Sequence, residues 1–318
     1  MTGPRQHALP AAYLAGFSEL RCPRARESLL WVGRRAKADI YRQKAANLGY
    51  ARDIYTLTRP ILATAGPWDP SMLDSTWSFV EGRLWTATDS LVSNLSEVFD
   101  ASLWLFVLVE FVSQVFVRGS DFGLRFVDRI NRISPDLTTL FDAGHSDHIN
   151  AARLIELHRL RGAVLQAEWT VIHAATGRFI ANDLARTPVL SGDRRCYIIP
   201  LRADAVLQVA FGPGVQPMRL SVAEDQDKWV VGPILHEIAT DALLTRVNAL
   251  LAYSARAEIY GAPEQLIREL HGTMSAEPRP LGEAEPTFLA PFRDLGDTRQ
   301  HEQLVNLVSR RPSETRTR

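Results

Sequence analysis

Three polar residues at helical spacing interrupt the most apolar stretch of the sequence. Glu110, Gln114 and Arg118 lie at positions i, i+4 and i+8, so they share one face of a helix predicted to cover about residues 100–118. A buried arginine needs a carboxylate, because an unpaired charge is costly to remove from water. Glu81, at the edge of the apolar face of the preceding predicted helix, is the expected partner of Arg118. The alternatives are that the stripe faces solvent with ion pairs inside the helix, and that Glu81 extends into water.

Two further polar residues lie in a segment whose apolar residues alternate as in strands. Asp183 follows the strand-like residues 178–182 and precedes a loop that contains a proline. We therefore expect its carboxylate at a strand end, where ligand-contacting groups often lie. A turn in which Asp183 caps its own backbone is the alternative. His173 is alone on a predicted strand, and we expect it to be a half-buried, hydrogen-bonded side chain.

The sequence contains one candidate metal site. His145 and His148 are three residues apart, with Asp142 and Asp147 beside them. On a helix the two imidazoles would share a face and could bind a divalent metal if carboxylates elsewhere completed the shell. We favour a solvated polar loop over a metal site, because only two histidines support the metal interpretation. We therefore predict no cofactor.

The familiar catalytic motifs do not occur in the sequence. No glycine-rich phosphate loop joins a predicted strand to a helix, and there is no Gly-x-Ser-x-Gly elbow. Cys22 and Cys196 are too few for a disulfide framework or a cysteine-only zinc site, and they fit reduced thiols in a cytoplasm. Nucleotide binding through those loops and covalent catalysis have no support from the sequence.

The composition indicates a globular protein without a strong electrostatic field. Of 318 residues, 46% are hydrophobic, and 36 basic residues balance 36 acidic ones. Zero net charge gives no whole-molecule field that would draw the chain to nucleic acid or to an anionic membrane, so a nucleic-acid-binding surface is disfavoured but not excluded, and we expect no membrane partner. Residues 103–117 are apolar but shorter than the roughly 20 residues of a membrane span, and residues 1–10 lack the apolar core of a secretory signal. We expect a cytoplasmic protein whose partner is unknown.

Periodicity predicts helices on both sides of a β-rich region. Apolar residues repeat every three or four positions in five segments, and they alternate with period two over about residues 164–232. Residues 29–55 favour strands or short helices. The predicted helices cover residues 72–95, 100–118, 124–133, 151–160 and 234–259, and the predicted strands cover 168–173, 178–181, 196–199, 206–211 and 228–231.

This order of elements predicts an α+β fold. A mainly helical core would pack on a small, mostly antiparallel sheet, because the strands do not alternate with crossover helices. Neither half has enough elements to be self-sufficient, so we predict one domain over residues 1–272. Beyond it, residues 273–318 are rich in Pro, Glu, Gly and Thr and predict a flexible polar tail.

Short motifs along the chain resemble those of one bacterial protein family. Residues 7–17 contain every letter of the pattern His-x-x-Pro-x-x-Tyr-Leu-x-x-Phe. Gln114 to Arg118 is similar to the family's Gln-x-x-x-Arg-Thr-Pro, although Gly119 replaces the threonine here. Over about residues 5–261 the ordered set of matches resembles the domain of unknown function 4238 family.

The resemblance implies no activity, but it marks the same polar residues as the spacing does. They are spread over about 240 positions, and we expect them to converge in the fold. The set consists of His7, Glu81, Gln114, Arg118, Asp183 and Asn248.

Two functions are compatible with such a set. The first is a bacterial hydrolase that acts on a phosphate-containing substrate, nucleic acid or nucleotide, in defence or stress. In it, His7 is the general acid or base, Glu81 or Asp183 orients it, Arg118 clamps the anion, and Gln114 and Asn248 contact the substrate. The second is a non-enzymatic binding or effector module. There His7, Glu81, Arg118 and Asp183 form a buried network, and a surface elsewhere recognises the partner.

Overall fold

The computed structural model describes residues 5–20, 24–37, 39–52, 54–58, 71–93, 95, 98–119, 121–133, 145–191, 194–212, 214–223 and 228–274. Its helices are α1 (Ala11–Ala15), α2 (Met72–Ser93), α3 (Ala101–Leu103), α4 (Val109–Arg118), α5 (Asp121–Ile133), α7 (Ser146–Leu165), α8 (Asp241–Ser254) and α9 (Glu264–His271), with the 3₁₀ turns η1 (Ala25–Glu27) and η2 (Ala45–Asn47) and the π-helical turn η3 (Trp104–Leu108). Its strands are β1 (Arg5–His7), β2 (Leu29–Arg34), β3 (Ile40–Lys44), β4 (Tyr50–Arg52), β5 (Phe99–Asp100), β6 (Glu168–Ala174), β7 (Ala181–Asn182), β8 (Thr187–Ser191), β9 (Arg194–Arg202), β10 (Ala205–Phe211), β11 (Arg219–Val222), β12 (Trp229–Gly232), β13 (Leu235–Ala239) and β14 (Glu258–Gly261). The fold is therefore α+β, as the sequence predicts.

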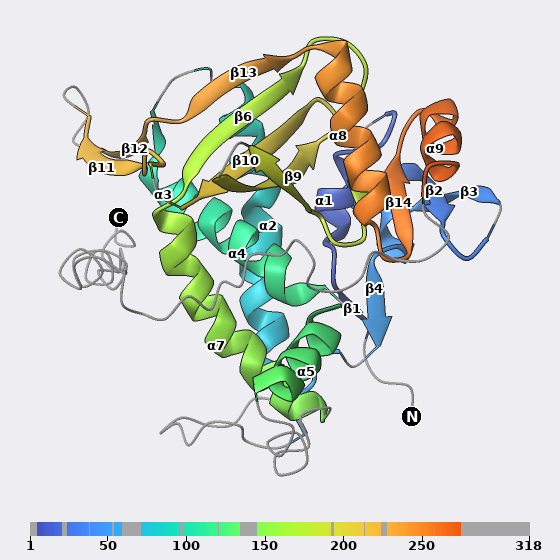
Figure 1. Ribbon diagram of the computed structural model, residues 1–318, viewed down its shortest axis with the longest axis horizontal. Coiled ribbons are helices and arrows are strands. Elements are labelled where there is room, and N and C mark those ends of the chain that lie inside the picture. The colour runs from blue at the N-terminus through green and yellow to red at the C-terminus, as the bar shows by residue number, and fades with distance from the viewer. Residues whose placement is uncertain are drawn as a thin grey trace, which may run out of the picture. The chain divides into compact units, whose positions relative to one another are not determined.

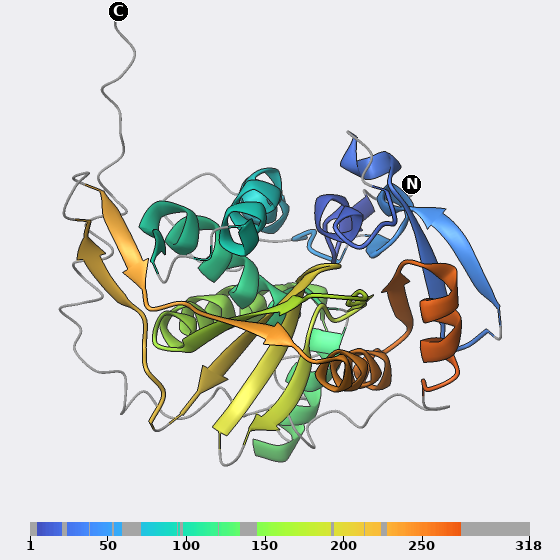
Figure 2. The same cartoon turned by 90° about the horizontal axis from the view of Figure 1, so that it is seen from above.

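A five-stranded sheet divides the core into two layers. Its strand order is β13-β6-β10-β9-β8, and all neighbours are antiparallel except β13 and β6. Alternate side chains point to opposite faces, so Ile172 and Val206 pack against α8, whereas Trp169 and Tyr197 meet Trp104 and Phe116 of the helical layer. Figures 1 and 2 show α8 on one side of this sheet and α2, α4 and α7 on the other.

The central helical segment is α3, η3 and α4, which run without a break from Ala101 to Arg118. The Asp100 carboxylate caps its start by accepting the backbone N–H groups of Ser102 and Leu103. The segment is long and apolar enough to cross a membrane, but most of it is buried inside the fold, as in the core helix of a soluble protein. The prediction of a central helix here is confirmed.

The predicted helical face of α2 is also confirmed. Leu73, Trp77, Val80 and Leu84 are all buried against the helical layer. Leu95, which the pattern included in the same face, lies beyond the helix end and is 69% exposed.

A second sheet joins the two ends of the described chain. Its strand order is β3-β2-β14-β7, so the N-terminal strand β2 pairs with β14 near the C-terminus. Beside it, β1 and β4 form a separate antiparallel ribbon. Both pairings are long-range, and hydrophobic periodicity within a short segment contains no information about them.

Two predicted elements are wrong. Residues 235–239, included in the last predicted helix, form β13, because the open edge of β6 offers its backbone groups as partners. The helix begins only at Asp241, where Thr240 Oγ1 accepts the N–H of Leu243 at 3.2 Å. At its other end, residues 258–261 are β14 rather than helix. The predicted strand over 178–181 is reduced to β7. The Arg178 carbonyl and the Ile180 N–H bond to the Asn248 side chain, and the Phe179 N–H bonds to the backbone of a turn, so these residues do not pair with a neighbouring strand.

The contact pattern groups Met1–Glu285 in one compact unit and Pro286–Arg318 in another. All described residues belong to the first unit. From residue 275 on, the predicted tail of residues 273–318 lies outside the described residues, as do Cys22, Asp142 and the proposed helix start at 69–70.

Candidate functional site

The polar stripe of the central helix is partly buried and partly paired with α7. Gln114 and Arg118 are 1% and 3% exposed, whereas Glu110 binds Arg161 of α7 at 2.9 Å. The outward-facing alternative is therefore wrong for Arg118. Its guanidinium is inside the fold, where its charge needs compensation.

Arg118 joins three elements through one nitrogen atom. Its Nη2 lies 2.6 Å from Glu81 Oε1 of α2 and also donates to the backbone carbonyl of His7 in β1. The guanidinium lies over the rings of Trp77 and Tyr55, at 5.3 Å and 5.9 Å from their centroids. The predicted pairing of Arg118 with Glu81 is confirmed.

His7 is half-buried beside this ion pair. Burial lowers the pKa of its imidazole below 6.5, and the nearby Glu81 charge and a hydrogen bond with the Leu48 backbone only partly offset that effect. Nδ1 is buried and has no hydrogen-bond partner in the described part of the chain. The ring of Tyr50 lies edge-on at 6.1 Å. Burial therefore favours the neutral form of the His7 imidazole, and one of its nitrogens is held out of bulk water.

A second carboxylate, missed from the sequence, shares this location. Asp74 is seven residues before Glu81, so both lie on one face of α2, with Trp77 between them. Burial and the Glu81 charge raise the pKa of Asp74, while Arg118 and His7 oppose the rise. The seven-residue spacing between Asp74 and Glu81 could have identified Asp74 from the sequence.

Three of the predicted site residues also line a small cavity. Gln114, Arg118 and Asp183 are in its wall, together with the segment Ala8–Pro10 that follows His7. The cavity has room for about one water molecule. It is too small for a substrate. His7, Asp74 and Glu81 are half-exposed, so they are the part of the cluster that a substrate can reach.

Asp183 caps a distant loop rather than its own turn. Its two carboxylate oxygens accept the backbone N–H groups of Arg256 and Ala257, each at 2.8 Å. Burial nevertheless raises the pKa of Asp183 to about 7, and those two hydrogen bonds oppose the rise. Asp183 thus fixes the loop after β7 to the turn that follows α8.

Asn248 does not join the cluster. Its side chain accepts the N–H of Ile180 at 3.1 Å and donates to the carbonyl of Arg178 at 2.8 Å. It is 3% exposed, so it clamps this segment to α8 and has no surface for a substrate. His173 meets the expectation of a satisfied side chain, because its Nε2 lies 3.0 Å from Nδ1 of His236.

The carbonyl groups at the end of α4 all accept side-chain hydrogen bonds. The last four carbonyls of a helix have no partner inside it, and this end also has the negative pole of the helix dipole. Here buried cations and one phenol supply the donors. The pairs are Arg186 with Val115 O at 2.9 Å, Arg125 with Phe116 O at 2.7 Å, Arg153 with Val117 O at 2.9 Å and Tyr55 with Arg118 O at 2.7 Å.

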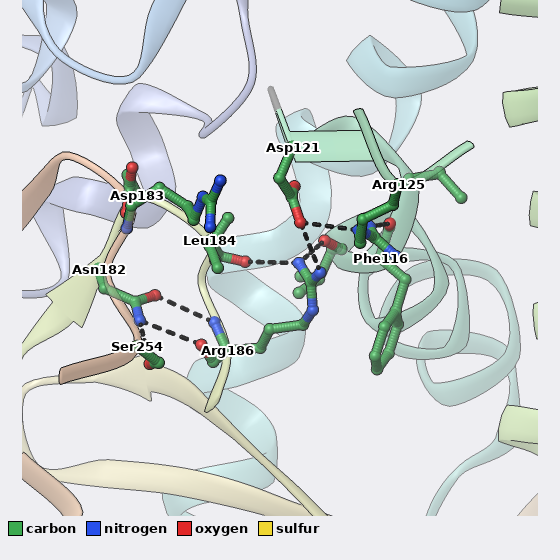
Figure 3. A network of polar contacts seen from close by, with 12 residues as sticks. Phe116, Asp121, Arg125, Asn182, Asp183, Leu184, Arg186 and Ser254 are labelled. Carbon is green, nitrogen blue, oxygen red and sulfur yellow. Dashed lines mark hydrogen bonds and ion pairs between the residues drawn. The ribbon is translucent and has the colours of Figure 1, made fainter. Parts of the chain in front are cut away.

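Arg186, also missed from the sequence, is the most deeply buried of these cations. Its side chain is 0% exposed and lies 3.2 Å from Asp121 Oδ2, which also binds Arg125 at 2.8 Å. The Asn182 side chain holds the Arg186 backbone at both its N–H and its carbonyl (Figure 3). The only sequence signal for this network was the spacing of four residues between Asp121 and Arg125.

The candidate metal pair has a structural role in the described chain. His145 Nδ1 accepts the N–H of Asp147 at 3.2 Å and caps α7. Asp147 is buried and accepts the N–H of Thr58 at 2.8 Å. Among the described residues, no group of three or more His, Cys, Asp or Glu side chains could hold a metal ion.

The fold and this cluster define an α+β protein with a buried arginine network at the end of its central helix. Comparisons with protein-family models, curated proteins and solved structures found no match. The resemblance of the motifs to the domain of unknown function 4238 family therefore stays an expectation from the sequence.

Proposed function

We propose that the protein is a hydrolase of phosphate-containing substrates in which His7 is the general base. The observation that carries the proposal is the half-buried His7 imidazole, which lies beside Glu81 and whose pKa is lowered by burial, so that its neutral form is favoured. Because Nδ1 is buried, Nε2 is the nitrogen that takes the proton from water or from a hydroxyl group as it attacks phosphorus.

The neighbouring groups have separate roles in this proposal. The Arg118 side chain is buried, so it acts as a positioning residue that holds the His7 backbone and the Glu81 carboxylate, rather than as the anion clamp expected from the sequence. Glu81 stabilises the imidazolium after proton transfer by its negative charge. Asp74, whose pKa is raised by burial and by the Glu81 charge, is the nearby carboxyl group that we assign to proton donation to the leaving oxygen.

We place this activity in the bacterial cytoplasm, in defence or stress. The buried Cys196 thiol, which is free of any disulfide, supports a reducing compartment. The burial of most of the helix Ala101–Arg118 supports a protein outside the membrane.

The test is hydrolysis of bis(p-nitrophenyl) phosphate by the wild type, His7→Gln and a matched control, His271→Gln. We expect His7→Gln to lower kcat by at least about 100-fold, the usual contribution of a general base, with little change in KM. His271, whose ring bonds the Arg34 carbonyl at 2.8 Å outside the cluster, controls for loss of a histidine. Full activity of a folded His7→Gln variant would refute the proposal.

The alternative function is a binding or effector module with a purely structural network. It is favoured by the fact that Arg118 bonds to Glu81, His7 and Gln114, all within the protein. In that case Arg118→Met lowers the melting temperature, and no hydrolysis of any phosphate ester is lost when His7 is replaced.

A further inference from the structure

The zero net charge of the chain conceals a strongly basic segment. Residues 21–60 contain ten Lys and Arg but only three Asp and Glu, so the rest of the chain is correspondingly acidic. Such an asymmetry indicates a local anion-binding surface even when the whole-molecule field is weak. The described part of this segment comprises η1, β2, β3, η2 and β4.

Part of this positive charge lies beside His7. In the β1–β4 ribbon, His7 is directly opposite Tyr50, and Arg52 follows two residues later. Opposite residues, and residues two apart on one strand, share a face of a ribbon, so His7, Tyr50 and Arg52 lie on the same face. The Arg52 side chain is exposed, and Tyr50 is half-buried.

The turn η1 contributes to the same location. The Ala45 N–H donates to the carbonyl of Ser28, directly after η1, at 2.8 Å, so η1 packs against η2, the turn that leads into β4 beside His7. The charge of Arg26 also lowers the pKa of the His7 imidazole. Arg24 and Arg26 are both exposed. Figure 1 shows β1 beside β4. The nearby carboxylate Glu27 is already paired with Lys44, at 2.5 Å.

We propose that this basic surface, formed by Arg24, Arg26, Tyr50 and Arg52 around His7, binds single-stranded nucleic acid. Exposed arginines contact the phosphate backbone, and an aromatic ring between them offers a base a stacking partner. The bound strand then passes His7, where a phosphodiester can be cleaved. This inference names the substrate class of the proposed hydrolase and rests on that function for the cleavage step alone.

The first experiment measures binding by fluorescence anisotropy of labelled oligothymidylate and oligouridylate of about 20 nucleotides, long enough for several sites. We expect Arg26→Glu/Arg52→Glu to weaken binding at least tenfold at about 50 mM salt, because each neutralised phosphate contributes to affinity. The matched control is Arg219→Glu/Arg246→Glu, which makes the same charge change at exposed positions on β11 and α8. We expect its affinity to stay within about twofold of the wild type. Circular dichroism verifies that both variants fold.

The salt dependence of binding tests the phosphate contacts, and a Tyr50 variant tests the stacking of bases. With Arg26→Ala/Arg52→Ala, the slope of log affinity against log salt should fall by about 0.7 for each lost contact with a single strand. Tyr50→Leu should weaken single-strand binding about fivefold or more and leave duplex binding unchanged, since only unpaired bases stack on the ring. Equal losses in the two double-glutamate variants would overturn the proposal, as would absence of wild-type binding at about 50 mM salt or a preference for duplex.

Failure of the inference can be distinguished from failure of the proposed function. Binding of oligonucleotides without hydrolysis of bis(p-nitrophenyl) phosphate supports the surface and refutes the hydrolase. Hydrolysis of that small ester without oligonucleotide binding refutes the surface and leaves the hydrolase standing.

Discussion

The Arg118 guanidinium lies 2.6 Å from the Glu81 carboxylate and ties the last turn of α4 to the middle of α2. The same nitrogen donates to the His7 carbonyl, so one buried cation fixes the position of both neighbours. The geometry of the His7 site therefore depends on an ion pair whose cation holds the backbone of His7.

Replacing Arg118 by methionine should destabilise the fold. The change leaves the Glu81 charge without its partner and removes the donor to the His7 carbonyl, and we expect a loss of roughly 3 kcal/mol in the free energy of unfolding. Urea unfolding measures it. The exposed pair Arg268–Glu264 is the control, and Arg268→Met should cost less than about 1 kcal/mol. An equal loss in both variants would show that burial of Arg118 has no special effect.

Arg186 should be the most sensitive cation of the network. Arg186→Met leaves Asp121 buried with Arg125 as its remaining partner and leaves the Val115 carbonyl without its donor, so we expect a loss of about 3–5 kcal/mol. Adding Asp121→Asn should recover part of that loss, because it removes the buried charge. A double-mutant cycle by urea unfolding tests the coupling. Strict additivity of the two single changes would contradict it.

Asp183 should make stability fall as the pH rises. Its pKa is raised from 3.8 to about 7 in the fold, so between these values the folded state binds more protons than the unfolded chain. The ionisation of Asp183 therefore does not change the free energy of unfolding below about pH 4, and it lowers that free energy above pH 7. Asp183→Asn removes this term, and its melting temperature should fall less between pH 5 and pH 8 than that of the wild type. Asp39→Asn, at an exposed position, is the control.

The activity of the proposed hydrolase should decline in acid. Because burial lowers the pKa of His7 below 6.5, its base form persists at pH 7, and kcat/KM should decrease as the pH falls through that lowered value. Initial rates on bis(p-nitrophenyl) phosphate from pH 5 to 8 provide the profile. A midpoint above 6.5 would mean that another group is the base.

His145 should matter for stability and not for metal content. His145→Ala removes the cap of α7 and should cost about 1 kcal/mol. Elemental analysis of the purified wild type and variant checks for bound metal. A stoichiometric metal that disappears in the variant would restore the metal interpretation of His145 and His148.

Local patterns predicted the elements whose apolar residues recur at regular spacing or in an unbroken run. The face of α2 from Leu73 to Leu84 follows from spacing of three or four residues. The central helix and β6 are buried on both faces, and they follow from their concentration of apolar residues. The strand β13 could not be predicted in this way. Its backbone partner is β6, more than 60 residues earlier, and the edge of that sheet overrides local preference.

The sequence by itself determined that Arg118, if buried, needs a carboxylate, and it supplied Glu81 as the candidate. Only the tertiary structure decided that Arg118 is buried, that Asn248 lies outside the cluster and that Asp183 caps a remote loop. It alone brought Arg186 and Arg153 to the end of α4, because unsatisfied helix carbonyls attract donors from any segment that the fold places beside them. Spacing constrains neighbours along one element, whereas contacts between elements depend on packing of the whole chain.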